Sequence, residues 1–432
     1  MHQNRETFNP KRRHNKLKSL VYRGNELHFD NIPIGQIGLK YGTPSYIYSA
    51  QTLESRFREY QESFGDQPHL ICFAVKANSN LSVLKLLAKL GSGFDIVSGG
   101  ELTRVLKAGG DPKKVVFSGI GKTSEEIKFA LEVGIYCFNV ESHGELRRLE
   151  TICQGNGKKA KISLRVNPDV DAKTHPYIST GLKENKFGIP WDDVIGLYKE
   201  AKVSPYLEIV GIDCHIGSQM VDPLPFIDAA KRIISLSSEL NTLGINISHL
   251  DFGGGLGISY DDEIPPSPKT WVNSLLSIIE NKKLKILLEP GRSIAGTAGI
   301  LLTRVEYIKK GDMKNFLVVD AAMNDLARPA LYNSYHQIRE ATLNKNLNRI
   351  KYDVVGPICE TGDFLAKNRE LAVKEGDFIA IMETGAYGMS MASNYNSRGR
   401  PAEILINKGE TTLIRRRESA DDLFYHEIPT SS

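Results

Sequence analysis

Short apolar runs rich in β-branched residues alternate with amphipathic stretches between about residue 70 and residue 290. Runs of this kind predict strands that are buried on both faces, as in a parallel sheet. The eight runs are Leu70–Val75, Phe94–Val97, Val115–Phe117, Ile135–Asn139, Ile162–Val166, Ile209–Cys214, Ile247–Asp251 and Ile286–Leu288.

Helix-like stretches separate these runs. One face of the first stretch carries Leu81, Leu84, Leu87 and Leu90. The others are Glu101–Ala108, Glu125–Val133, Gly144–Glu150, Asp192–Ala201, Pro225–Leu240 and Trp271–Glu280. Eight strands that alternate with helices over about 220 residues predict a (β/α)8 barrel of the TIM type. An open, doubly wound parallel sheet is the alternative that this pattern leaves open.

A change of pattern after about residue 300 predicts a second, mostly β domain of the sandwich or barrel type. Strand-like runs now follow one another with few helices between them. They are Leu301–Ile308, Asn315–Val319, Ile350–Val355, Asp377–Met382 and Glu403–Ile406, and Leu20–Ile47 is also strand-like. We therefore expect the barrel over residues 48–300 and a discontinuous β domain made of residues 20–47 and 301–425. A chain of 432 residues is long enough for two such domains.

Composition and charge argue against several classes of function. The net charge of +4 offers no concentrated basic face for nucleic acid. The basic run Lys11–Arg13 stands in a polar segment, and residues 1–19 are predicted to be a disordered tail. No segment approaches the roughly 18–20 apolar residues of a membrane helix. Five scattered cysteines without a CxxC pair favour a reducing compartment, and hence the cytoplasm.

Unusual polar residues stand in or just after the predicted barrel strands. In a barrel these positions share the carboxyl-terminal face, where loops build the active site. Residues far apart in the sequence would therefore converge on one pocket. They are Lys76, Asp95, Ser98, Asn139, Glu141, Arg165, Asn167, His215, Ser218, Glu289, Gly291 and Arg292.

Three of these positions carry recognisable chemistry. Lys76 ends an apolar strand, and a lysine in a pocket can form a Schiff base with an aldehyde. The turn at Gly253, Gly254 and Gly255 is suited to cradle a phosphate with its backbone N–H groups. His215 offers a flat ring for stacking, with Ser218 as a further phosphate ligand. A solvent-facing lysine, a plain tight turn and a structural histidine are the alternatives. No metal site is predicted, because no second ligand stands at metal-binding spacing from His215.

Two further groups of residues have side chains suited to binding a pyridine cofactor and its substrate. Glu289 could keep a pyridine nitrogen protonated, and Arg292 could bind a carboxylate through two hydrogen bonds. An ordinary surface salt bridge is the alternative for this pair. Cys359, beside Glu360 in a turn-rich stretch, is the cysteine placed for chemistry, although a loop cysteine without a role fits equally.

Taken together, these residues resemble the fold-type III pyridoxal-phosphate decarboxylases, over about residues 30 to 415. Several stretches are similar to one group of that family, the diaminopimelate decarboxylases. They are Asn167–Val170, Thr174–Gly181, Lys186–Gly188, Met323–Leu326 and Arg328–Tyr332. Two departures are Thr361, where serine is usual, and Gly399, where proline is common.

The resemblance implies a role for each candidate residue. Catalytic roles fall to Lys76, which binds pyridoxal phosphate covalently, to His215, which stacks on its ring, and to Cys359, which protonates the product. Glu289 pairs with the pyridine nitrogen, and Asp95 is counted with the cofactor-binding residues. The phosphate is bound by Ser218, Gly253, Gly254, Gly255, Gly291, Arg292 and Tyr387. The distal end of the substrate is held by Arg292, Arg328, Tyr332, Glu360 and Tyr387.

The implied reaction is the decarboxylation of meso-2,6-diaminopimelate to L-lysine and CO2, the last step of lysine biosynthesis. The family is also homodimeric, with the Cys359–Glu360 loop entering the neighbouring subunit's site. The alternatives are a decarboxylase of another amino acid, such as ornithine, arginine or carboxynorspermidine, and a pyridoxal-phosphate carrier without turnover. A racemase on a related barrel is a third, which would be expected to use a catalytic tyrosine.

Overall fold

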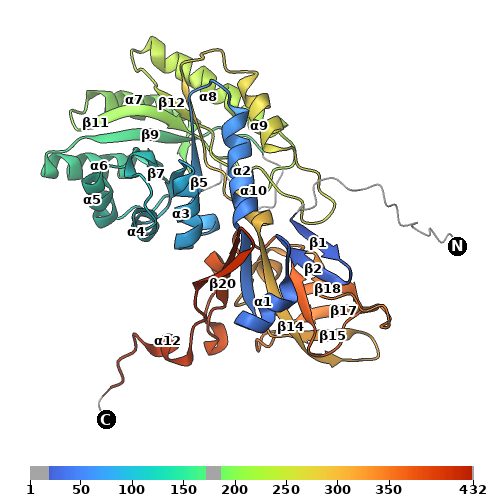
Figure 1. Ribbon diagram of the computed structural model, residues 1–432. Coiled ribbons are helices and arrows are strands. Elements are labelled where there is room, and N and C mark those ends of the chain that lie inside the picture. Colours follow the sequence, from blue (N-terminus) through green and yellow to red (C-terminus); the bar gives the residue numbers. More distant parts are fainter. Residues whose placement is uncertain (1–18, 172–185, 431–432) are drawn as a thin grey trace.

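The computed structural model describes residues 19–171 and 186–430. Of the predicted tail, residues 1–18 lie outside this description, and so does the whole stretch Thr174–Gly181. Figure 1 shows two lobes, with the barrel strands and their helices in one and the later strands in the other.

Eight parallel strands form a closed barrel in the first lobe. Each short buried run predicted from the sequence became one of these strands, and β8 pairs with β9 to close the ring. Closure excludes the open, doubly wound sheet. The strands are β5 (His69–Ala74), β6 (Gly93–Ile96), β7 (Val115–Phe117), β8 (Cys137–Val140), β9 (Ala160–Asn167), β11 (Leu207–Asp213), β12 (His249–Asp251) and β13 (Lys285–Leu288).

Helices surround the barrel and cover its outer face (Figure 1). Their amphipathic faces bury leucines and valines against the strands, while α2 precedes the first strand and packs against α9. The helices are α2 (Ala50–Ser63), α3 (Leu81–Lys89), α4 (Gly99–Lys107), α5 (Ser124–Val133), α6 (His143–Asn156), α7 (Val194–Val203), α8 (Leu224–Thr242), α9 (Pro268–Leu276) and α10 (Arg292–Ala295). The short strand β10 (Ile189–Pro190) adds to β9.

The side chains inside the barrel form an apolar layer, and the layer next to it is polar. Alternation along a strand sends every second side chain inward. A separate cluster of buried apolar side chains joins four strands, and consists of Leu70, Cys72, Val116, Cys137 and Leu287. One step further along the strands, Asp95 pairs in register with Ala74, and Asp213 with Asp251. Charged side chains therefore occupy the layer next to the carboxyl ends of the strands.

The second lobe is built on a nine-stranded mixed sheet. Its path runs β18-β17-β15-β14-β4-β20-β21, and β19 pairs with both β14 and β16. The strands are β4 (Ser45–Ser49), β14 (Gly299–Lys309), β15 (Asn315–Val319), β16 (Ile338–Glu340), β17 (Ile350–Val355), β18 (Phe364–Leu371), β19 (Phe378–Ile381), β20 (Ala402–Asn407) and β21 (Glu410–Arg415). The N-terminal strand β4 thus lies between two strands from the second half of the chain.

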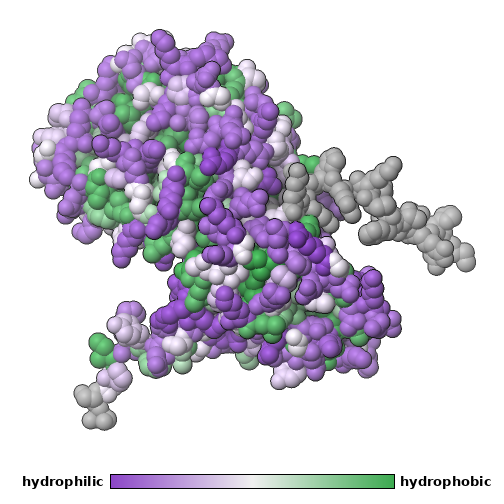
Figure 2. Space-filling view, in the orientation of Figure 1, coloured by the Kyte–Doolittle hydropathy of each residue, from purple (hydrophilic) through white to green (hydrophobic). Residues whose placement is uncertain are grey.

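The N-terminal segment differs from its prediction in one place. The sequence pattern predicts strands throughout residues 20–47, and β1 (Leu20–Arg23), β2 (Glu26–Phe29) and β3 (Ile32–Pro33) agree with that prediction. The helix α1 (Ile34–Tyr41) does not. Two short helices, α11 (Arg328–Tyr332) and α12 (Ala420–Phe424), complete the lobe. Figure 2 shows the narrower region where the two lobes meet. The exact limits of the two domains stay a prediction.

Candidate active site

Lys76 and Asp95 form an ion pair at the carboxyl ends of two neighbouring strands. Lys76 follows β5 in a single turn of 3-10 helix, and Asp95 lies in β6. Lys76 Nζ lies 2.6 Å from Asp95 Oδ2. The lysine side chain is 39% exposed, whereas the aspartate side chain is fully buried. A buried carboxylate needs a partner of opposite charge, so Asp95 holds the lysine amine at the barrel mouth.

The charges around Lys76 keep its amine protonated. Loss of water contact works to lower the pKa of Lys76, but the charge of Asp95, which also accepts a hydrogen bond from the amine, leads the opposing effects and leaves the pKa above its usual value. A protonated amine cannot attack a carbonyl. Asp95 Oδ2 is within hydrogen-bonding distance to accept the proton when the amine reacts.

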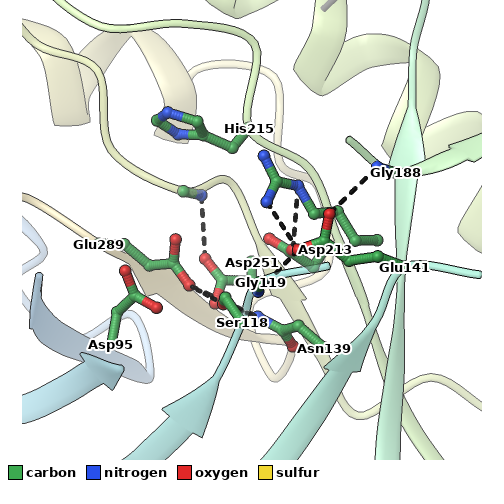
Figure 3. Close-up of polar contacts among 12 residues, drawn as sticks. Asp95, Ser118, Gly119, Asn139, Glu141, Gly188, Asp213, His215, Asp251 and Glu289 are labelled. Atoms are coloured by element: carbon green, nitrogen blue, oxygen red, sulfur yellow. Dashed lines mark hydrogen bonds and ion pairs between the residues drawn. The ribbon is translucent and has the colours of Figure 1, made fainter. Parts of the chain in front are cut away.

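Glu289 follows β13 and points into the same mouth (Figure 3). Its Oε1 lies 3.4 Å from both the Ser118 hydroxyl and the Asn139 amide nitrogen. Burial, and then the charges of Asp251 and Asp95, raise the pKa of Glu289 well above its usual range. The carboxyl is thus positioned by neutral donors and has a strong tendency to hold a proton.

His215 lies two residues after the end of β11 and is fixed as a neutral ring. The backbone N–H of Gly254 donates to His215 Nδ1 at 3.2 Å, so this nitrogen must carry a lone pair. Burial, with the nearby charges of Arg165 and Lys76, lowers the pKa of His215 well below its usual value. The imidazole therefore carries its proton on Nε2 at neutral pH.

The glycine turn after β12 has no room for side chains. Gly253 has a φ of +64°, and its N–H donates to Asp251 Oδ1 at 2.9 Å. A Cβ on Gly254 would lie 2.3 Å from the Glu289 carbonyl oxygen, and one on Gly255 would lie 2.5 Å from the Gly217 carbonyl oxygen. Glycine is required here because the turn packs directly against the backbone of neighbouring strand ends.

Arg292 is predicted both to bind the cofactor phosphate and to bind the substrate. It begins α10 directly after Gly291 and is 5% exposed. One guanidinium nitrogen donates to the Tyr260 hydroxyl at 2.6 Å, and the other donates to Ser218 Oγ at 3.1 Å. The ring of Tyr387 lies 4.8 Å from the guanidinium carbon. Arg292, Ser218, Gly291 and Tyr387 thus meet at one corner of the mouth.

Arg328 and Tyr332 lie beside a cavity of about 340 Å³. Both belong to α11, and the Arg328 guanidinium lies 5.2 Å from the Tyr260 ring and 5.8 Å from the Tyr332 ring. Arg328 also donates to Ser334 Oγ at 3.1 Å. Arg328 and Tyr260 line this cavity, and Arg292 also contacts Tyr260, so two buried cations contact the same tyrosine.

Cys359 and Glu360 do not take part in the contacts that join the other predicted site residues. Both are exposed, on the loop between β17 and β18. The Cys359 backbone N–H donates to Asn396 Oδ1 at 2.7 Å. The loop is therefore held to the second lobe, with its thiol and carboxylate facing outward.

The sequence prediction missed three side chains that shape this site. Tyr260 lies between the two arginines, and its only sequence signal is an aromatic residue shortly after the glycine turn. Asp213 is hidden in the apolar run Ile209–Cys214, where a lone acid is a sign of an inward-facing site residue. Asp251 was assigned to the glycine turn without a role of its own.

The comparisons with known proteins agree on a family. The family model described as "Pyridoxal-dependent decarboxylase, pyridoxal binding domain" matches residues 50–296. A diaminopimelate decarboxylase from Pseudomonas aeruginosa is 53% identical over 411 residues, which cover 95% of this chain and 99% of that protein.

The chain belongs to the diaminopimelate decarboxylase family.

Solved structures of family members support the same placement. A diaminopimelate decarboxylase from Helicobacter pylori complexed with L-lysine is 45% identical, with a TM-score of 0.88, and the match covers 91% of this chain and 99% of that one. A second, from M. jannaschii in co-complex with L-lysine, is 37% identical with a TM-score of 0.91, covering 96% and 98%. Family members of known structure therefore share both the barrel and the second lobe.

Pyridoxal phosphate is the cofactor of this family, and the residues at the barrel mouth fit it. Lys76 offers an amine for the aldehyde of the cofactor, His215 a neutral ring for its face, and Glu289 a carboxyl group for its nitrogen. They lie beside a glycine turn that has no space for larger residues. Arg292 Nε is also buried without a hydrogen-bond partner among the described residues. These are the groups that a phosphorylated pyridine aldehyde requires.

Proposed function

We propose that this protein converts meso-2,6-diaminopimelate to L-lysine and CO2 with pyridoxal phosphate as cofactor. The observation that carries this proposal is the pair Arg292 and Arg328, which are both buried against Tyr260, a residue that lines the cavity together with Arg328. Diaminopimelate has a distal carboxylate that ornithine lacks, and guanidinium groups bind carboxylates with good geometry. The membership in the diaminopimelate decarboxylase family supports the same substrate over other amino acids.

Lys76 is the residue that would hold the cofactor covalently. What the bound cofactor supplies is a sink for the electron pair left behind as CO2 departs. The amine must first lose a proton, and Asp95 Oδ2, at 2.6 Å, is the acceptor. The ion pair also keeps the amine at the mouth of the barrel, so it remains positioned for recapture at the end of each turnover.

The remaining cofactor contacts follow from the position of each side chain. His215 presents a neutral ring face, because Gly254 fixes its Nδ1 as an acceptor. Glu289 would face the pyridine nitrogen. Ser218, Arg292 and Tyr387 would bind the phosphate together with the glycine turn, since all of them lie at one corner of the mouth.

The distal end of the substrate would be held by Arg328, Tyr332 and Arg292 around the cavity. Glu360 would add a carboxylate for the distal ammonium group. Cys359 would hold the proton that the product carbon receives. Because Cys359 and Glu360 are exposed on a loop of the second lobe, we propose that they complete the site of a second copy in a homodimer.

Product analysis tests the proposed reaction directly. Purified protein with pyridoxal phosphate is given meso-diaminopimelate, and CO2 and lysine are measured by mass spectrometry. The expected result is equimolar lysine and CO2, with much slower release from ornithine, arginine and carboxynorspermidine. Comparable or faster release from one of those substrates would overturn the assignment.

Mixing two inactive variants tests the shared site. Lys76→Ala and Cys359→Ala each remove one half of every site. In a dimer with shared sites, a random mixture should recover about one quarter of the wild-type activity, because hybrid dimers contain one intact site. A mixture as inactive as its parents would reject the shared site.

The location of the protein stays a prediction. No helix among the described residues is long and apolar enough to span a bilayer. All five cysteines are free thiols, which is compatible with the predicted cytoplasmic location.

A further inference from the structure

Three carboxyl groups meet inside the barrel beneath the proposed cofactor site. Asp213 and Asp251 end β11 and β12, Glu289 directly follows β13, and one oxygen of each lies within 4.8 Å of the others. Their side chains point toward one another (Figure 3). They are 1%, 0% and 7% exposed, so water does not screen their charges. We call this group the carboxyl triad.

The charges around the carboxyl triad do not balance. Two cations are in reach, and each is already paired. Arg165 lies 3.0 Å from Glu141 and 4.0 Å from Asp213, while Lys76 lies 2.6 Å from Asp95. Five carboxyl groups thus face two cations in a buried layer. Full ionisation of all five would leave adjacent negative charges without compensation.

The unpaired oxygens of the carboxyl triad point to a bound proton. Carboxyl oxygens of Asp251 and Glu289 lie within 4.8 Å of one another, and a proton on either group would relieve the repulsion between them. Asp213 Oδ1 and Asp251 Oδ2 are buried and have no hydrogen-bond partner among the described residues. Asp251 already accepts the Gly253 N–H on its first oxygen, which favours its ionised form.

We propose that the carboxyl triad retains one proton at neutral pH, shared between Asp251 and Glu289, and that Asp213 and Asp251 are positioning residues that keep this proton at Glu289. The proposal deepens the proposed function, and it rests on Glu289 as the partner of the cofactor nitrogen. When the cofactor is bound, this proton would pass from Glu289 to the pyridine nitrogen, and the ionised carboxylate left on Glu289 would stabilise the protonated ring that makes the cofactor an effective electron sink.

The other groups around the carboxyl triad do not replace this role. Cys72, Cys137 and Cys214 remain neutral thiols, because burial raises the pKa of each well above its usual value. His249 lies two residues before Asp251 on β12, and burial lowers its pKa to about 3. The charged neighbours are Lys76, Asp95, Glu141 and Arg165, which are paired as described.

The directions of the pKa shifts agree with the geometry. Burial, followed by mutual repulsion, raises the pKa of Asp213 and Glu289 well above their usual ranges. Burial raises the pKa of Asp251 to about 7, although the Gly253 N–H opposes this change. The charge of Asp251 thus increases the proton affinity of both Asp213 and Glu289, and the charge of Asp213 adds to this effect at Glu289.

Infrared spectroscopy of the full-length protein after removal of the cofactor tests the proposal without turnover. A protonated carboxyl group has a carbonyl stretch that shifts in heavy water. We expect a band at pH 7 that Glu289→Gln removes and that titrates away as the pH rises. In Asp213→Asn and Asp251→Asn the midpoint of this titration should fall by roughly one pH unit, because a repelling charge is gone.

Asp325→Asn is the matched control, because Asp325 is a buried carboxyl in the second lobe whose pKa burial raises to about 7. This variant should lose its own band and leave the midpoint of the carboxyl triad unchanged. A spectrum that is identical in wild type and Glu289→Gln would overturn the proposal, and so would an unchanged midpoint in Asp213→Asn. The wild-type titration needs no variant to fold.

A second measurement connects the proton with the cofactor. The affinity for pyridoxal phosphate should decline with rising pH in the wild type. In Asp213→Asn and Asp251→Asn it should decline at a lower pH, by the same shift as the infrared midpoint. Affinity that falls at the same pH in all three proteins would reject the positioning role. Neither measurement uses diaminopimelate, so failure of the proposed substrate would leave this test intact.

Discussion

Lys76 Nζ lies 2.6 Å from Asp95 Oδ2, across two neighbouring strands whose register pairs Ala74 with Asp95. The barrel itself sets this distance, because both residues are placed by the same pair of hydrogen-bonded strands. The ion pair therefore gives the chain a positioned amine before any ligand arrives.

Replacing Lys76 with alanine should abolish the near-visible absorbance of the bound cofactor and nearly all turnover. The variant has no amine to bond with the aldehyde. Absorbance spectra after incubation with pyridoxal phosphate, followed by a CO2 assay, check both effects. Lys85→Ala, on the exposed face of α3, is the control and should behave as wild type. Retained turnover in Lys76→Ala would refute the assignment.

Asp95→Asn should make the Lys76 amine reactive at lower pH. The charge of Asp95 raises the pKa of Lys76, so its removal lets the amine lose its proton earlier. The rate of cofactor loading, followed by absorbance across a pH series, should show a midpoint below that of wild type. A midpoint that rises or stays in place would contradict the role of this ion pair.

Cys359→Ala should bind the cofactor normally and turn over about 100-fold more slowly or worse, which is the usual effect of losing a proton donor. Cofactor absorbance and steady-state rates separate the two effects. Cys153→Ala, which removes a buried thiol from α6, is the matched control and should keep the wild-type rate. An unchanged rate in Cys359→Ala would reject its role as the proton donor.

Tyr260→Phe should raise the KM for diaminopimelate by about tenfold, because a hydrogen bond to a charged group is lost while the ring remains. The hydroxyl accepts from Arg292 at 2.6 Å, so its loss leaves that guanidinium less firmly positioned. The cofactor spectrum should stay unchanged. Tyr307→Phe, at an exposed position of β14, controls for the loss of a hydroxyl alone. Equal KM values in the two variants would argue against a positioning role.

Asp325→Asn should change how stability depends on pH. Burial raises the pKa of Asp325 to about 7 in the folded protein, whereas an unfolded aspartate titrates near its usual, much lower value. Between these two pKa values the folded state binds more protons, so the wild type loses stability as the pH rises through this window.

Urea unfolding at pH 5 and at pH 8 measures this effect. The variant lacks the titrating group, so its stability relative to wild type should be greater at pH 8 than at pH 5. Asp312→Asn, on an exposed turn, should show no such difference between the two pH values. The same relative stability of Asp325→Asn at both pH values would contradict the assigned protonation.

The sequence was sufficient for the barrel because its strands are short, continuous and buried on both faces. The predicted strand Val115–Phe117 matches β7 of the barrel to the residue, and Asn315–Val319 matches β15 of the second lobe equally well. The helix α1 could not be predicted in this way, because it contains Gly35 and Gly38, which disfavour helices. It forms because it packs onto the second lobe, where a Cβ on Gly38 would lie only 3.0 Å from Leu302.

Other features depend on contacts between distant residues. The strand β18 carries Lys367, Asn368, Arg369 and Glu370, a run that reads as a polar loop. It pairs with β17 through an irregular register, where Asn368 has a φ of +56° and donates its N–H to Asp353. Likewise, the predicted ends of the strands indicated that Lys76 and Glu289 would meet at the barrel mouth. They gave no indication that Tyr260 would lie between two arginines.

The place of β4 in the second sheet has a consequence for how the protein is made. This strand leaves the ribosome early, yet its two neighbours, β14 and β20, begin about 250 and 350 residues later. The barrel can close while both edges of β4 still lack their hydrogen-bonding partners, and unpaired strand edges promote aggregation. A nascent chain that stalls between Lys309 and Ala402 would therefore carry a finished barrel beside a strand with one unpaired edge, which makes this stretch of synthesis the one most exposed to aggregation.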